Sequence, residues 1–364
     1  MTKPIPDAPD LRAPQDIDAA WLTGLLQGAG VDAVVDSFTA KPVGSGQIGD
    51  SVRFALKYAR AADGAPASIV GKFPSADPDS FNTGVMLGNY VREVQFYRQL
   101  SPTALVSTPY CYGTALDEAS GRFVLMMEDL APAEQGDQLK GVSLEQARLV
   151  VDEAAKLHGS HWGDEAIEDL AWVSGTRAAP SGAATPEMVA ALWTAFRERY
   201  GERLEPDWVE VGERLSTRFA GFTQRGDGPR CLTHNDFRPD NMMFATPAGG
   251  KPVTVLDWQS VSFGTGAVDV GYFLAGALTP DQRRAAEPEL LARYLEGLKA
   301  LGVAGYRMDA LKRDYAGGGL LLFLTAFFAA MVVKRTARGD DMFIQMLGSG
   351  AQHAIDHDAL STLA

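Results

Sequence analysis

Residues 234–241 (HNDFRPDN) constrain the chain more than any other segment, because they form a short polar loop between apolar stretches. Residues 242–244 and 252–256 are apolar and predict two strands after this loop, the second of which ends at Asp257. Strands so close along the chain predict a β-hairpin, with Gly249-Gly250 in its turn. The hairpin would bring the end of the polar loop and Asp257 to the same end of the two strands.

Asp236, Asn241 and Asp257 are the side-chain types that phosphoryl transfer requires. One carboxylate accepts the proton of an attacking hydroxyl group, while an amide oxygen and a second carboxylate hold the magnesium ions that neutralise the phosphates. The alternative is a polar turn that matches this pattern by coincidence. The strands predicted on both sides of the loop argue against coincidence.

Composition limits the classes of protein to consider. A chain of 364 residues is too long for one compact core and predicts two domains. The net charge of −13 argues against non-specific binding to nucleic acid or to an anionic membrane. Cys111 and Cys231 lie in separate apolar segments, which is typical of a reducing compartment and favours a cytoplasmic protein. Residues 1–15 are rich in Pro and Asp and predict a flexible arm, not a signal peptide.

The composition changes near Asp129. Before it, segments of alternating polarity predict strands, and after it long helical patterns dominate. We therefore expect an N-terminal lobe over residues 16–129 and a C-terminal lobe over residues 130–364. Residues 143–146 (SLEQ) form a capping box that opens the first long helix of the second lobe.

A glycine-rich segment follows the strand predicted at residues 34–43. It is followed by a second strand, whereas a dinucleotide-binding fingerprint needs a helix there. A glycine-rich loop between two strands is the form that covers nucleotide phosphates in kinases. The alternative is a plain hairpin turn. The residues that would contact the phosphates are Gly44, Ser45, Gly46, Gln47 and Gly49.

Lys72 lies near the end of a third predicted strand, residues 68–73. It is a candidate to pair with the phosphates of a nucleotide, and the alternative is a lysine reaching solvent from an edge strand. Glu93, on a helix predicted at residues 85–100, is its natural partner. The alternative for Glu93 is a solvated helix charge.

Two features suggest other readings. Residues 316–333 carry no charge and are just long enough to span a membrane, but the many amphipathic helices of the second lobe favour a buried core helix. His353 and His357 are spaced for a metal site of a hydrolase. Because further ligands and a glutamate base are missing from the motif, we expect them on an exposed helix face.

The chain resembles the aminoglycoside phosphotransferase and choline kinase superfamily from about Val34 onward. The segments that carry the resemblance are HNDFRPDNMMF, VLDWQSVSFGTGAVDVGYFL, REVQFYRQL and AAKLHGSHW, and they are most similar to the ecdysteroid-kinase-like (CHK kinase-like) branch. The resemblance implies an α+β, two-lobed protein-kinase-like fold. The small lobe would hold an antiparallel sheet and a helix, and the larger lobe would be mainly helical. Only twelve positions separate Asp257 from Asp269, which leaves no room for the activation loop of a protein kinase.

The resemblance also implies roles for single residues. Asp236 would be the catalytic carboxylate, and Asn241 and Asp257 the ligands of Mg²⁺. Arg238 would stabilise the charge of the transferring phosphate or form a structural salt bridge. His234 and Asp269 would hold the catalytic loop by hydrogen bonds. The residues implied to bind the nucleotide are those of the glycine-rich loop, Lys72, Glu93 and the linker residues Met127, Glu128 and Leu130.

The implied function is an ATP- or GTP-dependent kinase that phosphorylates a hydroxyl group of a small molecule. A catalytically inactive pseudokinase is the alternative, although the retained Asp236, Asn241 and Asp257 argue against it. The acidic chain suits a cationic aminoglycoside, whereas the branch resemblance suggests a larger, more apolar alcohol. The sequence predicts no nucleic-acid or membrane partner and leaves the oligomeric state open.

Overall fold

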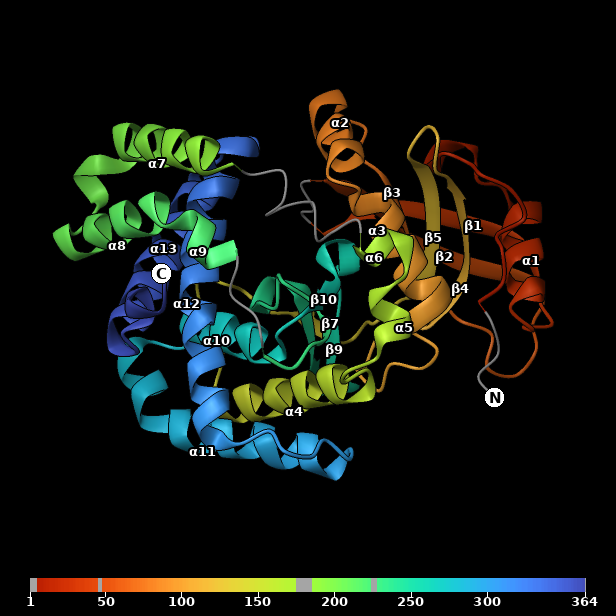
Figure 1. Cartoon of the computed structure of the whole chain (residues 1–364). Coiled ribbons are helices and arrows are strands. Elements are labelled where there is room, and N and C mark those ends of the chain that lie inside the picture. The colour runs from red at the N-terminus through yellow and green to blue at the C-terminus, as the bar shows by residue number, and fades with distance from the viewer. Residues whose placement is uncertain (1–4, 45–47, 175–184, 224–227, 364) are drawn as a thin grey trace. The chain divides into compact units, whose positions relative to one another are not determined.

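The structure is a computed structural model that describes residues 5–44, 48–174, 185–223 and 228–363. The chain forms two compact units (Figure 1). The first comprises Met1–Pro132 and Val255–Ser260, and the second comprises Ala133–Thr254 and Val261–Ala364. The first unit holds an antiparallel sheet and the second is mainly helical, so the expected α+β class is confirmed. Composition did not indicate that residues 255–260 return to the first unit.

The first unit is built on a five-stranded antiparallel sheet of order β1-β2-β3-β5-β4. The strands predicted at residues 34–43, directly after the glycine-rich segment and at residues 68–73 are present. The five strands of the sheet are β1 (Val34–Val43), β2 (Gly49–Arg60), β3 (Ser68–Pro74), β4 (Cys111–Asp117) and β5 (Arg122–Glu128).

Helix α1 (Ala19–Gly28) supplies much of the core of this unit. Its apolar face, which includes Trp21 and Leu25, packs with Phe54 and Phe73 of the sheet. The described part of the expected flexible arm is instead held against β4. There, the Ala8 backbone N–H donates to the Thr114 carbonyl oxygen at 2.8 Å, because a backbone group on an exposed strand edge needs a partner.

The helix expected over residues 85–100 is broken in the structure. It consists of α2 (Pro78–Met86), α3 (Asn89–Gln95) and a π-helical turn (Phe96–Leu100). Gly88 separates α2 from α3 with a φ of 68°, a conformation that glycine adopts at no steric cost. The prediction missed this break because the apolar spacing continues through it.

The second unit contains the long helices of the chain. The predicted capping box at Ser143 and Gln146 opens α4, with each side chain bonded to the other residue's backbone. The helices include α4 (Leu144–Ser160), α7 (Pro186–Tyr200), α8 (Pro206–Thr217), α10 (Gly266–Ala277), α11 (Pro280–Ala300), α12 (Met308–Val332) and α13 (Ala337–Asp356).

The predicted hairpin is formed by β8 (Met242–Thr246) and β9 (Gly249–Val255), which are neighbours in a three-stranded sheet with β6 (Glu134–Gln135). The prediction for the turn is wrong. Pro247 and Ala248 occupy it, and Gly249-Gly250 begin β9. Both strands are longer than their apolar runs, because backbone pairing continues into polar residues at the exposed end.

Helix α12 contains the apolar stretch and lies in the core of the second unit, where it packs with α7, α10 and α13. Within the described ranges it is the one helix long and apolar enough to cross a membrane, but 67% of its most apolar window is buried inside the protein. That burial is typical of the central helix of a helical domain.

Helices α10 and α12 approach closely at two glycines. A Cβ atom on Gly271 would lie 3.0 Å from the Gly318 Cα atom, and a Cβ on Gly318 would collide with the backbone at Gly271 and Tyr272. Glycines 317–319 therefore permit close helix packing here and do not break α12.

Candidate active site

Lys72 on β3 forms ion pairs with two carboxylates of the first unit. Its Nζ atom lies 2.7 Å from Glu93 Oε2 and 2.8 Å from Asp257 Oδ1. The predicted contact between Lys72 and Glu93 is confirmed, and Asp257 joins it. Their role in nucleotide binding stays a prediction.

Burial and charge compete at this cluster. Burial lowers the pKa of Lys72, but the charges of Asp257 and Glu93 outweigh burial and leave the pKa raised. Burial raises the pKa of Glu93 in spite of the neighbouring ammonium group. Lys72 is therefore a fixed positive charge, which is the property needed to hold phosphate oxygens.

The glycine-rich loop begins at Gly44, whose φ of 76° suits glycine, and ends at Gly49 on β2. A Cβ atom on Gly49 would lie 3.0 Å from the Phe73 carbonyl oxygen and 3.3 Å from Lys72 Cε. Glycine at this position thus allows the end of the loop to lie against Lys72. Ser45, Gly46 and Gln47 lie outside the described residues.

The linker residues follow β5. Met127 is buried and pairs with Val70 of β3, while Glu128 and Leu130 are half-buried. Between them, Asp129 accepts a hydrogen bond from Arg53 Nη2 at 2.9 Å. The sheet therefore holds the linker in place, which is what a nucleotide-binding segment requires, but no contact here tests that role.

Asp257 stands on a short segment that α3 and the π-helical turn hold tightly. The Trp258 and Phe96 rings stack with centroids 3.9 Å apart, and the Trp258 backbone N–H donates to Glu93. Arg92 Nη1 donates to the Gln259 carbonyl oxygen at 3.3 Å. Asp257 itself has a φ of 65°, an unusual conformation for a residue other than glycine. Such conformations cluster at functional sites.

In the second unit, Asp269 of α10 holds the loop that follows β7 (Cys231–Thr233). Its carboxylate accepts the backbone N–H groups of His234 at 2.6 Å and Asn235 at 2.9 Å. Asn235 has a φ of 62°, so these two bonds hold a turn that few residues adopt. The structural role predicted for Asp269 agrees with this geometry.

His234 and His158 extend this support. His234 Nδ1 accepts the backbone N–H of Asp236 at 3.2 Å, as expected for a residue that shapes the loop. His158 of α4 lies with Nε2 3.3 Å from Asp269 Oδ2 and Nδ1 2.8 Å from the Tyr294 hydroxyl. Buried groups thus fix the orientation of the Asp269 carboxylate.

Asp236 is held by three donors. Its Oδ1 atom accepts from Arg238 Nε and from the Tyr272 hydroxyl, each at 3.0 Å, and its Oδ2 atom accepts from Asn241 Nδ2 at 2.8 Å. Three donors on its two oxygen atoms fix the rotamer of this carboxylate. The sequence placed Asp236 and Asn241 in one short loop, and the structure brings their side chains into contact.

Arg238 is engaged on two sides. Besides Asp236, its Nη1 atom donates to Asp240 Oδ2 at 2.9 Å. Burial lowers the pKa of Arg238, but the charges of Asp236, Tyr272 and Asp240 together outweigh burial and leave the pKa raised. These contacts favour the structural salt bridge, the second of the two roles considered for this residue.

The Asn241 side chain has a defined orientation. Its Nδ2 atom donates both to the Asp236 carbonyl oxygen at 2.9 Å and to the Asp236 carboxylate. Because both partners are acceptors, the amide nitrogen must face Asp236. The Oδ1 atom therefore points away from Asp236, which is the arrangement needed of a metal ligand.

Tyr272 is the functional candidate that sequence reasoning missed. It sits three residues after Asp269 on a helix of small and apolar residues, where a tyrosine suggests only core packing. The one available signal was its hydroxyl group, which needs a partner when buried. Its partner proved to be the candidate catalytic carboxylate.

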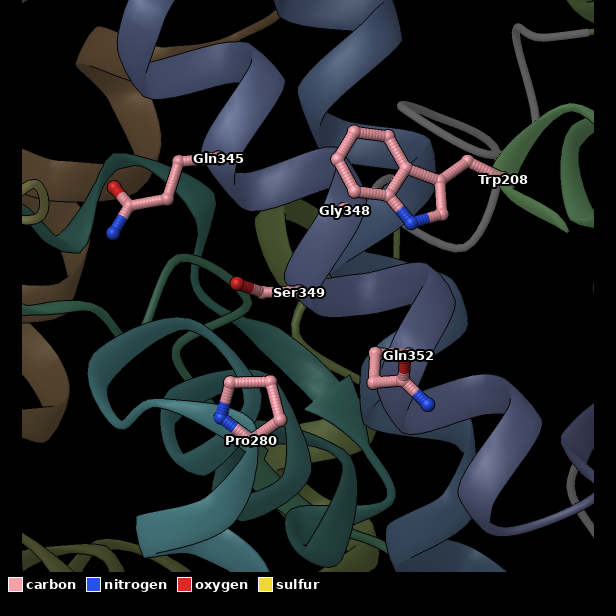
Figure 2. Close-up of a pocket in the computed structure, with 6 residues that line it drawn as sticks. All are labelled: Trp208, Pro280, Gln345, Gly348, Ser349 and Gln352. Atoms are coloured by element: carbon pink, nitrogen blue, oxygen red, sulfur yellow. The ribbon is translucent and has the colours of Figure 1, made fainter. Parts of the chain in front are cut away.

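One pocket of about 250 Å³ opens on the second unit between α8, α11 and α13 (Figure 2). Its volume lies below the usual range for small-molecule sites, and none of its lining residues belongs to the 234–241 loop. Of the tryptophans in the region 162–208, Trp208 lines this pocket while Trp193 is core. The residues that line it are Trp208, Pro280, Gln345, Gly348, Ser349 and Gln352.

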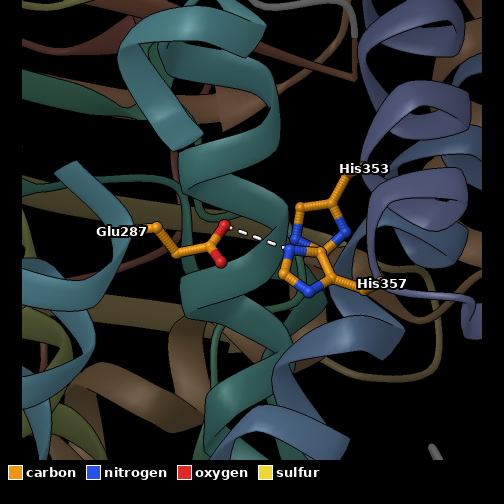
Figure 3. Close-up of side chains that lie close together, drawn as sticks. All are labelled: Glu287, His353 and His357. Carbon is orange, nitrogen blue, oxygen red and sulfur yellow. Dashed lines mark hydrogen bonds and ion pairs between the residues drawn. The ribbon is translucent and has the colours of Figure 1, made fainter. Parts of the chain in front are cut away.

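The expectation of an exposed face at His353 and His357 is wrong. His353 is fully buried, since Gly319 of α12 leaves room for its ring, and His357 is half-buried. Both approach Glu287, with candidate ligand atoms within 4.8 Å of one another (Figure 3). However, Arg283 Nη1 lies 2.8 Å from Glu287 Oε2 and 3.2 Å from His357 Nε2. A permanent cation already neutralises this carboxylate, so we assign the cluster to helix packing.

Residues 81–308, more than half of the chain, match the sequence pattern of the phosphotransferase enzyme family. A protein from Ralstonia eutropha JMP134 assigned to the aminoglycoside phosphotransferases shares the fold, with a TM-score of 0.53 and 16% identity over 93% of this chain and 98% of that one. An ethanolamine kinase from Plasmodium vivax is also similar (TM-score 0.48, 10% identity, 89% and 82% covered). So is ADP-bound aminoglycoside phosphotransferase APH(2'')-Ib (TM-score 0.48, 16% identity, 93% and 99% covered).

No protein of curated function matches the sequence. The likeness to the Ralstonia eutropha protein, at 16% identity, shows a common fold and says nothing of the substrate. The structure of the Ralstonia eutropha protein, with its TM-score of 0.53, confirms the kinase-like α+β fold expected from the sequence. The match over residues 81–308 is independent of that likeness, and it shows that the chain belongs to the phosphotransferase enzyme family.

Proposed function

We propose that the protein transfers the γ-phosphoryl group of ATP to a hydroxyl group of a small molecule. The observation that carries this proposal is the Asp236 carboxylate, fixed by Arg238, Tyr272 and Asn241 on a loop clamped by Asp269. A rotamer fixed in this way suits a group that must meet an acceptor hydroxyl in one geometry. The family match supports phosphoryl transfer as the reaction class.

The proton balance assigns a role to each oxygen of Asp236. Oδ1 already accepts two hydrogen bonds, so Oδ2 keeps the free acceptor site. The acceptor O–H proton passes to Oδ2 while the acceptor oxygen bonds to the γ-phosphorus. The bond from that phosphorus to the β,γ-bridging oxygen breaks, and its electron pair leaves on ADP.

Nucleotide binding is proposed for the first unit. Lys72, held by Glu93, would pair with phosphate oxygens. The glycine-rich loop from Gly44 to Gly49 would cover the phosphates, and Met127, Glu128 and Leu130 would contact the base. If Lys72 bound phosphate oxygens in place of Asp257, the Asp257 carboxylate would be released to bind a metal ion.

Asn241 Oδ1 and the Asp257 carboxylate are the proposed ligands of Mg²⁺. An amide oxygen and a carboxylate fit this ion, which prefers hard oxygen ligands and keeps several waters. Bound Mg²⁺ would neutralise charge on the nucleotide phosphates. Asn241 and Asp257 belong to different units, so their proposed pairing rests on the β8–β9 hairpin that joins them along the chain.

For the acceptor we propose a larger, mainly apolar alcohol, in line with the resemblance to the ecdysteroid-kinase-like branch. The net charge of −13 is the observation that favours a cationic aminoglycoside instead. A pseudokinase is the second candidate function, but all three candidate catalytic and metal-binding residues are retained. We propose a cytoplasmic location from the two buried free cysteines and the buried α12.

A screen of nucleotide consumption against hydroxylated small molecules tests the function. Sterols, amino alcohols, sugars and aminoglycosides are incubated with ATP or GTP and Mg²⁺, and phosphorylated products are identified by mass spectrometry. We expect ATP-dependent product with at least one alcohol, and none with Asp236→Asn. Tight nucleotide binding without turnover across the library would favour the pseudokinase.

A further inference from the structure

We propose that Tyr272 and Thr325 form a hydrogen-bond chain that positions the Asp236 carboxylate for phosphoryl transfer. The proposal rests on the proposed function of Asp236 and adds two positioning residues from α10 and α12. The first link is the hydrogen bond that the Tyr272 hydroxyl donates to Asp236 Oδ1 at 3.0 Å.

The second link joins Tyr272 to α12. Burial raises the pKa of Tyr272, and a contribution from the Thr325 side chain opposes this rise, which places Thr325 near the Tyr272 hydroxyl. Because Tyr272 donates its single proton to Asp236, Thr325 would be the donor in the proposed second link. Thr325 is also the only side chain between residues 316 and 333 that can donate a hydrogen bond, apart from backbone groups.

Burial makes this arrangement specific. Tyr272 is fully buried, and a buried hydroxyl without partners would be costly. Burial raises the pKa of Tyr272 well above its ordinary value, and the Asp236 charge raises it further. The phenol therefore stays protonated and acts only as a donor to the carboxylate.

The close packing of α10 and α12 brings Tyr272 and Thr325 near each other. A Cβ atom on Gly318 would meet the backbone N of Tyr272, so only glycine lets α12 pass this close. Thr325 lies seven residues after Gly318, which places both on the same face of α12. The glycines and the single threonine of the apolar stretch thus have a common explanation.

The proposed link from Thr325 through Tyr272 determines which oxygen of the Asp236 carboxylate accepts the proton of the acceptor hydroxyl. Tyr272 and Arg238 both occupy Oδ1, which turns Oδ2 toward the acceptor. Without the Tyr272 bond the carboxylate could rotate about its χ2 torsion, which is broad for aspartate. A misplacement of about 1 Å at a reacting group lowers rates by about 100-fold.

The test measures ATP hydrolysis, with water as the acceptor, together with ATP affinity by calorimetry. We expect Tyr272→Phe to lower the rate about 10- to 100-fold with ATP affinity within about twofold of wild type. Thr325→Val should lower the rate of hydrolysis less than Tyr272→Phe does, and Thr325→Ser, which keeps the hydroxyl, should have the wild-type rate. In the Tyr272→Phe background, Thr325→Val should lower the rate no further. Tyr315→Phe is the matched control, because Tyr315 is equally buried and donates to Glu287 at 3.0 Å away from the catalytic loop.

Asp236→Asn separates this inference from the proposed function. If Asp236→Asn stops hydrolysis but Tyr272→Phe keeps the wild-type rate, the positioning role of Tyr272 is wrong and the proposed function is retained. If wild type and Asp236→Asn hydrolyse ATP at the same rate, the proposed function is wrong, and the Tyr272–Asp236 contact is then tested by unfolding in denaturant. There, Tyr272→Phe and Asp236→Ala should be coupled by roughly 2- to 150-fold in the unfolding constant, and strict additivity would overturn the chain.

Discussion

Replacing Asp269 by alanine tests how the catalytic loop is held. The Asp269 side chain is 1% exposed and accepts the backbone N–H groups of His234 and Asn235. Alanine would leave both donors buried without a partner, and each such loss costs about 1–3 kcal/mol. The free energy of unfolding should therefore fall by roughly 2–6 kcal/mol, a large part of the roughly 5–15 kcal/mol typical of a domain.

The assay is thermal unfolding followed by circular dichroism, with guanidinium unfolding as a check. For a domain of about 150–250 residues the expected loss lowers Tm by roughly 4–24 °C. Asp281→Ala is the control, since Asp281 is 95% exposed and its ion pair with Arg284 lies at the surface. A Tm for Asp269→Ala within about 1 °C of the control would refute this account of the loop.

Three further predictions concern other parts of the chain. Lys72→Ala and Glu93→Gln should each weaken ATP binding in calorimetry, and the double variant should lose less than the sum of the two because both changes remove the same ion pair. Additive losses would show that this ion pair takes no part in nucleotide binding. Leu322→Asp puts an unpaired charge into the core of α12 and should yield aggregated protein, whereas recovery of the wild type only in detergent-extracted membranes would contradict a buried helix. Burial, with the nearby positive charges, lowers the pKa of His353 well below 6.5 in the folded protein. Below about pH 6.5 the unfolded chain therefore binds more protons than the folded protein, and the free energy of unfolding falls as the pH falls. Denaturant curves from pH 7 to 5 should show a smaller loss for His353→Leu, and an equal loss would exclude His353 as the cause.

Local patterns predicted much of the fold and part of the site. Alternating polarity identified the strands around Lys72, and the S-L-E-Q segment identified the start of α4. The 234–241 segment identified the loop that carries both Asp236 and Asn241, whose side chains are in contact in the structure. These features depend on neighbours along the chain, which a sequence displays directly.

Features set by packing between distant segments were not predictable. The Tyr272 contact depends on how α10 meets the catalytic loop, and His353 is buried because a glycine of α12 faces it. The break at Gly88 depends on a single left-handed residue inside a continuous apolar pattern. The second carboxylate at Lys72 comes from Asp257, 185 positions away along the chain.

The rate of phosphoryl transfer by Asp236→Asn, at saturating ATP and with wild-type nucleotide occupancy verified by calorimetry, shows whether Asp236 is the catalytic carboxylate. Single-turnover reactions with labelled ATP and the acceptor found by screening separate chemistry from binding. We expect a loss of about 10²- to 10⁴-fold in this rate with nearly unchanged ATP affinity, because the role proposed for Asp236 is at the acceptor hydroxyl and not on the nucleotide. A variant that transfers phosphate at the wild-type rate would contradict the assignment of Asp236 as the catalytic carboxylate.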